Sequence, residues 1–151
     1  MKKALNILLA EDDPNDLELF SQALRRDGAI VNLQRVHDGA EAIQYLQGAE
    51  PFSNRSHHPF PDIILLDLKM PRITGLDVLR WRKSHRDCAR VPLIMFSGSG
   101  LQKDVETAYT LGANSYFSKP NSFQELQETL RTILHYWSRA ELPEIPRQRC
   151  G

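Results

Sequence analysis

The sequence lacks the features expected of a secreted or membrane-spanning protein. It holds only two cysteines, Cys88 and Cys150, which are too few for a disulfide framework. No apolar stretch is long enough to cross a membrane. The basic start Met1-Lys2-Lys3 is followed by an apolar run that Asn6 interrupts, unlike a signal peptide. We therefore expect a cytoplasmic protein with reduced cysteines and no membrane contact.

An excess of charge of one sign is also missing. The 19 acidic and 19 basic residues cancel, which argues against direct binding of nucleic acid or of anionic membranes. No glycine-rich phosphate loop follows the first expected strand, which argues against a nucleotide or flavin site. The chain of 151 residues is long enough for one domain with a full core. We place this domain at 1–139 and expect an unstructured tail at 140–151, with no output domain.

What the sequence does contain is a regular alternation of short apolar runs and helical patterns. The clearest run, 63–66, has four aliphatic residues between Pro61 and Pro71 and predicts a strand buried on both faces. Four more strands are predicted, at 7–10, 30–36, 91–96 and 115–117, and a helix-period pattern follows each strand. This series predicts an α/β fold: a doubly wound five-stranded parallel sheet in flavodoxin-like order 2-1-3-4-5, with helices on both faces.

Local sequence patterns indicate where helices begin and where a segment without regular structure lies. Asp13 precedes Pro14 as an expected N-cap, and 74–77 and 122–125 have the pattern of capping boxes. Residues 49–60 show no periodicity, so we predict a long surface loop there.

Polar side chains of particular kinds stand where the predicted strands end. Because the carboxyl ends of parallel strands meet at one edge of a sheet, these side chains should converge. Carboxylates that converge need a cation, and hard oxygen ligands favour Mg²⁺. A lysine and a hydroxyl beside them would suit a small anion, which predicts transfer of a phosphoryl group onto a carboxylate. The residues are Glu11, Asp12, Asp67, Ser97 and Lys119.

This set, together with the run Asp67-Leu-Lys-Met-Pro and Gly75 downstream, resembles the receiver domain of bacterial two-component response regulators over roughly residues 5–137. The resemblance implies that Asp67 accepts a phosphoryl group from a histidine kinase or a phosphotransfer protein. It also implies that Asp12 binds Mg²⁺ directly, that Glu11 is an outer acid, and that the backbone carbonyl of Lys69 is a further ligand.

The same resemblance implies roles for residues at the last two strands. Ser97 corresponds to a switch hydroxyl, Lys119 to the lysine that pairs with the phosphoryl group, and Tyr116 to a switch aromatic. The peptide between Lys119 and Pro120 is expected to be cis, a conformation that is accessible before proline.

Some alternatives remain open at this stage. The acidic pair could be Asp12 and Asp13 instead of Glu11 and Asp12, although the capping role of Asp13 favours the latter. The favoured function is a signalling module that catalyses only its own phosphorylation and dephosphorylation. A metal-dependent phosphatase with an aspartyl-phosphate intermediate is the competing class, and a receiver used only as a binding surface is a third.

The phosphorylated receiver would then transmit its signal by binding another protein or by self-association. The expected surface is the face formed by the fourth helix, the fifth strand and the fifth helix, which could also form a homodimer. The long loop at 49–60 and the stand-alone architecture resemble the small regulators that are paired with phytochrome-like histidine kinases, which implies a kinase of that type.

Overall fold

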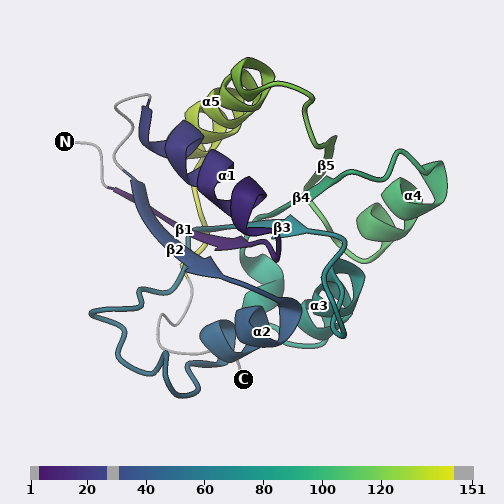
Figure 1. Ribbon diagram of the computed structural model, residues 1–151. Helices are drawn as coiled ribbons and strands as arrows, with labels where there is room; N and C mark the ends of the chain where they lie inside the picture. Colours follow the sequence, from purple (N-terminus) through teal and green to yellow (C-terminus); the bar gives the residue numbers. More distant parts are fainter. Residues whose placement is uncertain (1–3, 27–30, 145–151) are drawn as a thin grey trace.

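The computed structural model describes residues 4–26 and 31–144. Its centre is one sheet of five parallel strands in the order β2-β1-β3-β4-β5, as predicted (Figure 1). The strands are β1 (Leu5–Ala10), β2 (Val31–Val36), β3 (Ile63–Asp67), β4 (Leu93–Ser97) and β5 (Ser115–Ser118). The helices are α1 (Pro14–Arg26), α2 (Gly39–Gln47), α3 (Gly75–Lys83), α4 (Gln102–Thr110) and α5 (Phe123–Arg139), with a short 3₁₀ helix η1 (Cys88–Arg90).

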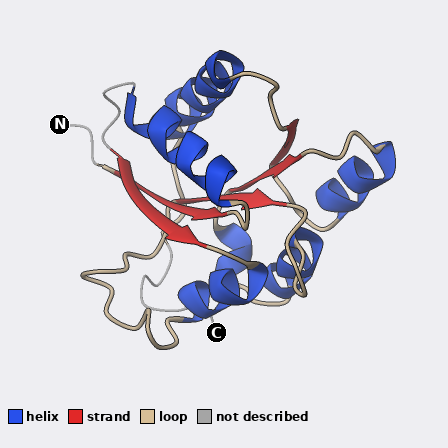
Figure 2. Cartoon of the chain, in the orientation of Figure 1, coloured by secondary structure: helices blue, strands red, loops and turns tan. Residues whose placement is uncertain are grey.

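Helices cover the sheet on both faces, as Figure 2 shows. Successive residues of a strand point to opposite faces, so Leu9 packs with α1 and α5 while Leu8 packs with α2 and α3. All five residues of β3 are buried, which explains why its aliphatic run is continuous rather than alternating. The two cores leave the carboxyl edge of the sheet as the place where polar groups can gather.

The predicted N-caps Asp13, Thr74 and Ser122 are present; of the capping box expected at 122–125, the structure shows the hydrogen bond that Ser122 Oγ accepts from the Glu125 backbone N–H. The Asp13 side chain accepts hydrogen bonds from the backbone N–H groups of Asn15 (2.8 Å) and Asp16 (3.3 Å) at the start of α1. Thr74 and Asp77 form a reciprocal capping box at α3. These caps fix where each helix begins, and therefore how the connection from the preceding strand is directed.

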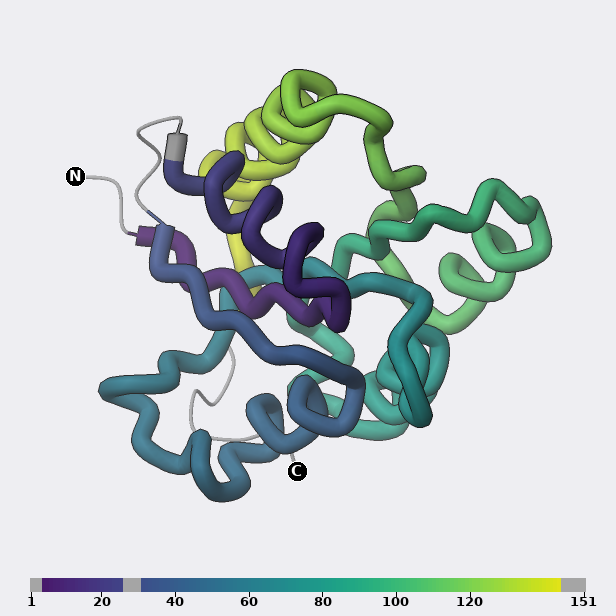
Figure 3. The backbone as a smooth tube through the Cα atoms, in the orientation of Figure 1, coloured from purple at the N-terminus to yellow at the C-terminus, as the bar shows by residue number. Residues whose placement is uncertain are grey.

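The segment 49–60 forms the predicted surface loop, and it lies beyond α2 next to β2 (Figure 3). The loop is held by contacts between its residues and Tyr45 of α2. Tyr45 Oη donates to the carbonyl of Pro59 at 2.7 Å, and the Arg55 guanidinium lies 5.4 Å from the centre of the Tyr45 ring. A segment without periodicity can thus be well packed when an arginine and an aromatic ring hold it.

Several expectations need correction. The Lys119–Pro120 peptide is trans, and Glu50–Pro51 is the cis peptide among the described residues. The two isomers of such a bond differ by only about 0.5–1 kcal/mol in a peptide, so the dipeptide alone does not decide between them. Strand β4 begins at Leu93 rather than at 91, because Pro92 has no N–H to donate to a neighbouring strand.

The cysteines also differ from expectation. Cys88 is fully buried and disulfide-bonded, which contradicts the expectation of reduced cysteines. The sequence alone does not show which residues the fold brings next to a cysteine. Cys150, Ile30 and most of the expected tail lie outside the described residues. Residues 141–144, which are described, have no regular structure, and no helix in the described ranges is long and apolar enough to cross a membrane.

Candidate functional site

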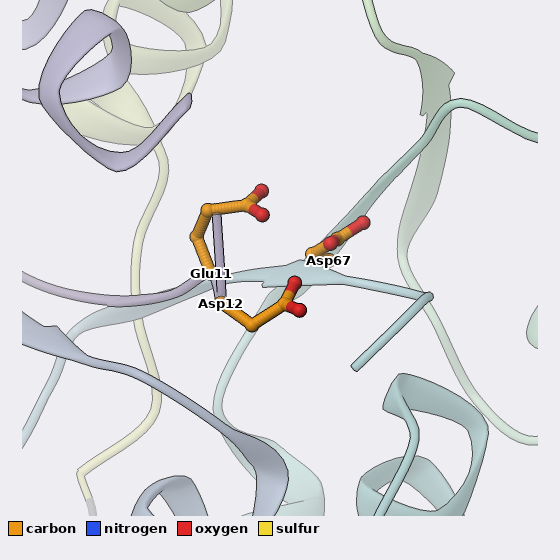
Figure 4. Close-up of side chains that lie close together, drawn as sticks. All are labelled: Glu11, Asp12 and Asp67. Carbon is orange, nitrogen blue, oxygen red and sulfur yellow. The ribbon is translucent and has the colours of Figure 1, made fainter. Parts of the chain in front are cut away.

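Three carboxylates meet at the carboxyl edge of the sheet. Glu11 and Asp12 directly follow β1, and Asp67 is the last residue of β3, which pairs with β1 through Ala10 and Leu66. One oxygen of each acid lies within 4.8 Å of the others, and Figure 4 shows the three side chains gathered at this point. Glu11 and Asp67 are buried, with 2% and 4% of their surface exposed, while Asp12 is exposed. The convergence predicted from the strand ends is therefore present.

A single lysine from the end of β5 reaches into this cluster. Lys119 Nζ lies 2.8 Å from Glu11 Oε2, 2.9 Å from Asp16 Oδ2 and 3.4 Å from Asp67 Oδ2. Asp16 belongs to the first turn of α1, and the sequence analysis did not include it in the site. Its place in the first turn of α1, the helix that directly follows the strand-end acids Glu11 and Asp12, was the available signal.

The protonation of the site reflects both burial and these contacts. Burial, assisted by the negative charge of Asp67, raises the pKa of Glu11 to about 7 although Lys119 opposes the change. Burial also raises the pKa of Asp67, again against the effect of Lys119. Burial alone would lower the pKa of Lys119, but its hydrogen bonds to Glu11 and Asp16 raise it. One cation thus serves several acids, and the cluster holds more negative charge than it can neutralise.

The oxygen atoms of the three acids differ in what they already contact. Glu11 Oε1 accepts the backbone N–H of Asp13 at 3.1 Å, and its other oxygen is paired with Lys119. Asp67 Oδ1 is buried and has no hydrogen-bond partner among the described residues. A buried oxygen without a partner is costly unless a cation or a donor joins it. Hard oxygen donors of this kind suit a divalent cation such as Mg²⁺ or Mn²⁺.

Asp13 stays out of the cluster because its side chain caps α1. The geometry therefore gathers Glu11 and Asp12, rather than Asp12 and Asp13, next to Asp67. Lys69 lies in the loop after β3 with an exposed side chain, and its role as a backbone ligand stays a prediction.

Ser97 and Tyr116 are connected through a residue that the sequence analysis did not single out. The buried Oγ of Ser97 accepts the backbone N–H of Ser99 at 2.9 Å. Tyr116 Oη donates to the carbonyl of the same Ser99 at 3.3 Å. The Ser99 hydroxyl in turn donates to Asp104 Oδ2 at 2.7 Å, which ties the loop to α4. The serines and glycines of the segment 97–100 suggest only a turn. In the structure, Ser97 and Tyr116 both form hydrogen bonds with Ser99 in this segment.

Comparison with known proteins identifies the family. The sequence profile of the response regulator receiver domain matches residues 7–131. The chain belongs to the response regulator receiver family. It is 34% identical to the probable methanogenesis regulatory protein FilR2 of Methanothrix harundinacea over 131 residues, covering 87% of this chain and 82% of FilR2. It is 31% identical to response regulator Rcp1 of Synechocystis sp., covering 87% of each protein.

Solved structures agree with this assignment. The phosphorylated cyanobacterial phytochrome response regulator RcpA superposes with a TM-score of 0.85 at 32% identity, over 94% of this receiver and 100% of RcpA. The Mn²⁺-bound form of Rcp1 superposes with a TM-score of 0.82 at 30% identity, over 93% of this receiver and 99% of Rcp1. The fold of this receiver is therefore that of its family.

One glycine of this receiver packs directly against the backbone of its central acid. A Cβ added to Gly75 would lie 2.5 Å from the carbonyl oxygen of Asp67 and 2.8 Å from Cα of Leu68. Gly75 N–H also donates to the carbonyl of Leu68 at 2.8 Å. The first residue of α3 must thus be glycine for the helix to approach the loop after β3 this closely.

Proposed function

We propose that this receiver is the phosphoacceptor module of a two-component phosphorelay, with Asp67 as the residue that is phosphorylated. The observation that carries the proposal is the buried Asp67 carboxylate, whose Oδ1 has no hydrogen-bond partner in the described part of the chain while its Oδ2 faces Lys119 at 3.4 Å. Membership of the receiver family supports it. The donor would be a histidine kinase or a phosphotransfer protein, and the protein would act as an enzyme only on its own phosphorylation and dephosphorylation.

The chemistry that this geometry supports is a simple displacement. An Asp67 carboxylate oxygen attacks the phosphorus of a phosphohistidine, the P–N bond breaks, and its electron pair remains on the imidazole nitrogen. Lys119 moves to pair with one oxygen of the transferred group, replacing its present contact with Asp67 Oδ2. The edge of the sheet thereby supplies both the nucleophile and a positive charge.

Mg²⁺ fits the site, with Asp12 and Asp67 as direct ligands, the Lys69 carbonyl as a third, and Glu11 as an outer acid. The support comes from the oxygens that remain available, because both oxygens of Glu11 are engaged while Asp12 is exposed. The structure of Rcp1 with Mn²⁺ is in keeping with a divalent cation at such a site. When bound, the cation supplies positive charge beside the acids and the phosphoryl oxygens.

The response would run through the β4–α4 loop. Ser97 would donate its hydroxyl hydrogen to a phosphoryl oxygen, and this would shift the Ser99 backbone that both Ser97 and Tyr116 contact. Tyr116 is half-buried, and its hydroxyl already donates to the carbonyl of Ser99 in this loop. A partner protein, or a second copy in a homodimer, would recognise this shift on the face formed by α4, β5 and α5.

The cognate kinase would be of the phytochrome type, and the protein would act in the cytoplasm. The similarity to RcpA, itself a phytochrome response regulator, supports the kinase class. The long loop at 49–60 is also in keeping with a kinase of the phytochrome type.

The test is phosphorylation by acetyl phosphate with Mg²⁺, followed by intact-protein mass spectrometry. Wild type should gain one phosphoryl group, and Asp67→Asn should gain none. Asp38→Asn is a matched control, because Asp38 also follows a strand but caps α2, a role that asparagine can fill. Phosphoryl label on Asp67→Asn would refute the assignment. Beryllofluoride-induced self-association, followed by light scattering in wild type and Ser97→Ala, would test the route through the β4–α4 loop.

A further inference from the structure

Lys119 lies closer to Asp16 than to the acid it is expected to serve. Its Nζ is 2.9 Å from Asp16 Oδ2 and 3.4 Å from Asp67 Oδ2. Asp16 lies 103 residues earlier in the chain, in the first turn of α1. The lysine is thus drawn toward a carboxylate that is not one of the three acids gathered at the strand ends.

The contacts of Lys119 differ in how easily they can be given up. The Glu11 side chain is 2% exposed, so releasing it would leave a buried charge without its partner. The Asp16 side chain is 34% exposed and can be hydrated when the lysine leaves. It also lies at a helix N-terminus, where a negative charge is favoured even without the lysine. Asp16 is therefore the partner that Lys119 can release at the lowest cost.

We propose that Asp16 is a positioning residue that holds Lys119 away from the phosphoryl position in the unphosphorylated receiver. This inference rests on the proposed function at Asp67. A phosphoryl group carries close to two negative charges and competes with the single charge of Asp16 for the lysine. Asp16 also repels the incoming anion. Both effects oppose phosphorylation, so Asp16 sets how readily the receiver is activated.

The experiment measures the affinity of the full chain for beryllofluoride in the presence of Mg²⁺, by ¹⁹F NMR titration. Asp16→Asn keeps the size of the side chain and removes its charge, and it should bind the probe more tightly by about fivefold, the ratio expected for one nearby charge in water. Asp16→Ser, a second uncharged variant, should change the affinity in the same direction. Asp16→Glu retains the charge and should stay near wild type.

Glu18→Gln is the matched control for net charge. Glu18 lies on the same helix but pairs with Arg35 at 3.6 Å instead of with Lys119. Its affinity for beryllofluoride should equal that of wild type. The difference between wild type and Asp16→Asn should also shrink as salt is added, because Asp16 is partly exposed.

Two results would overturn the inference. Equal or weaker binding by Asp16→Asn would mean that Asp16 does not restrain Lys119 or that it helps to orient it. Equal tightening by Glu18→Gln would reduce the effect to net charge. A wild-type receiver that does not bind beryllofluoride at all would instead refute the proposed function, and the two failures are therefore distinguishable.

Discussion

Two cations of this receiver, the buried Arg82 and the half-buried Lys119, have partners of opposite kinds. Arg82 is 3% exposed, and its guanidinium donates to the backbone carbonyls of Gly112 at 3.1 Å and Val91 at 2.5 Å. Its Nε has no partner among the described residues. Among the described residues, the Lys119 ammonium pairs with three carboxylates, and the side chain of one of them, Asp16, is 34% exposed.

The nature of these partners explains the two roles. Burial lowers the pKa of Arg82 to about 10, because neutral carbonyls do not offset the loss of water. The surrounding acids raise the pKa of Lys119 instead. Backbone carbonyls are fixed in place, so Arg82 ties α3 to the segments before β4 and β5. Carboxylates can be exchanged for a phosphoryl oxygen, so Lys119 can move.

Replacing Arg82 should give the largest loss of stability. Arg82→Leu leaves the carbonyls of Gly112 and Val91 without their donors, and hydrogen bonds from a charged group contribute about 1.5–3 kcal/mol each. We expect the free energy of unfolding to fall by about 2–4 kcal/mol in urea. Arg80→Leu on the same helix is the control, since the ion pair of Arg80 with Asp77 is exposed. Similar losses for the two variants would show that Arg82 is not a structural tie.

A divalent cation should stabilise the folded receiver, because the acids around Lys119 carry more negative charge than the lysine neutralises. Mg²⁺ at about 100 times its dissociation constant should raise the free energy of unfolding by about 2.7 kcal/mol. Asp12→Ala should lose most of this gain. Asp13→Ala should keep it, while losing about 1 kcal/mol without metal because the α1 cap is gone.

Urea unfolding with and without Mg²⁺ measures both effects in the two variants. An equal loss of the Mg²⁺ effect in both would mean that Asp13 also belongs to the site.

Replacing Asp77, an acid whose hydrogen-bond partners are fixed, should give the smallest loss of stability. A hydrogen bond from the Thr74 backbone lowers the pKa of Asp77, and contacts with the Thr74 hydroxyl and Arg80 add to this. Asp77→Ala should cost about 1 kcal/mol at pH 7, by loss of the capping box.

The pH dependence of this cost has a defined sign. Because folding lowers the pKa of Asp77, its contribution is present above the unfolded value of 3.8 and is lost as the pH falls through the folded value. Thermal unfolding of wild type and Asp77→Ala between neutral and acidic pH should therefore show the two converging in acid. A constant difference would contradict the role of the ionised carboxylate.

The sequence was most informative where chemistry and periodicity coincide. The order of the strands and the meeting of Glu11, Asp12, Asp67 and Lys119 follow from residues at strand ends, because parallel strands finish at one edge. Helix starts such as Asp13 could also be predicted, because capping depends only on local sequence.

The features that the sequence did not reveal depend on contacts made across the fold. Asp16 reaches Lys119 only because the fold brings the first turn of α1 and the residue after β5 to the same edge of the sheet, and Ser99 joins Ser97 to Tyr116 through its backbone. Arg82 was also missed, because backbone carbonyls leave no signature in the sequence.

The position of the long loop has a practical consequence for labelling this protein. Residues 49–60 lead into the start of β3, whereas Asp67 is at its end. The Cα atoms of Ile63 and Asp67, at the two ends of β3, are about 13 Å apart, and residues 61 and 62 add to the separation between the loop and the acids. Ser53 and Ser56 are exposed there, so a small fluorescent reporter attached at either position would follow binding at the acids without occupying their edge of the sheet.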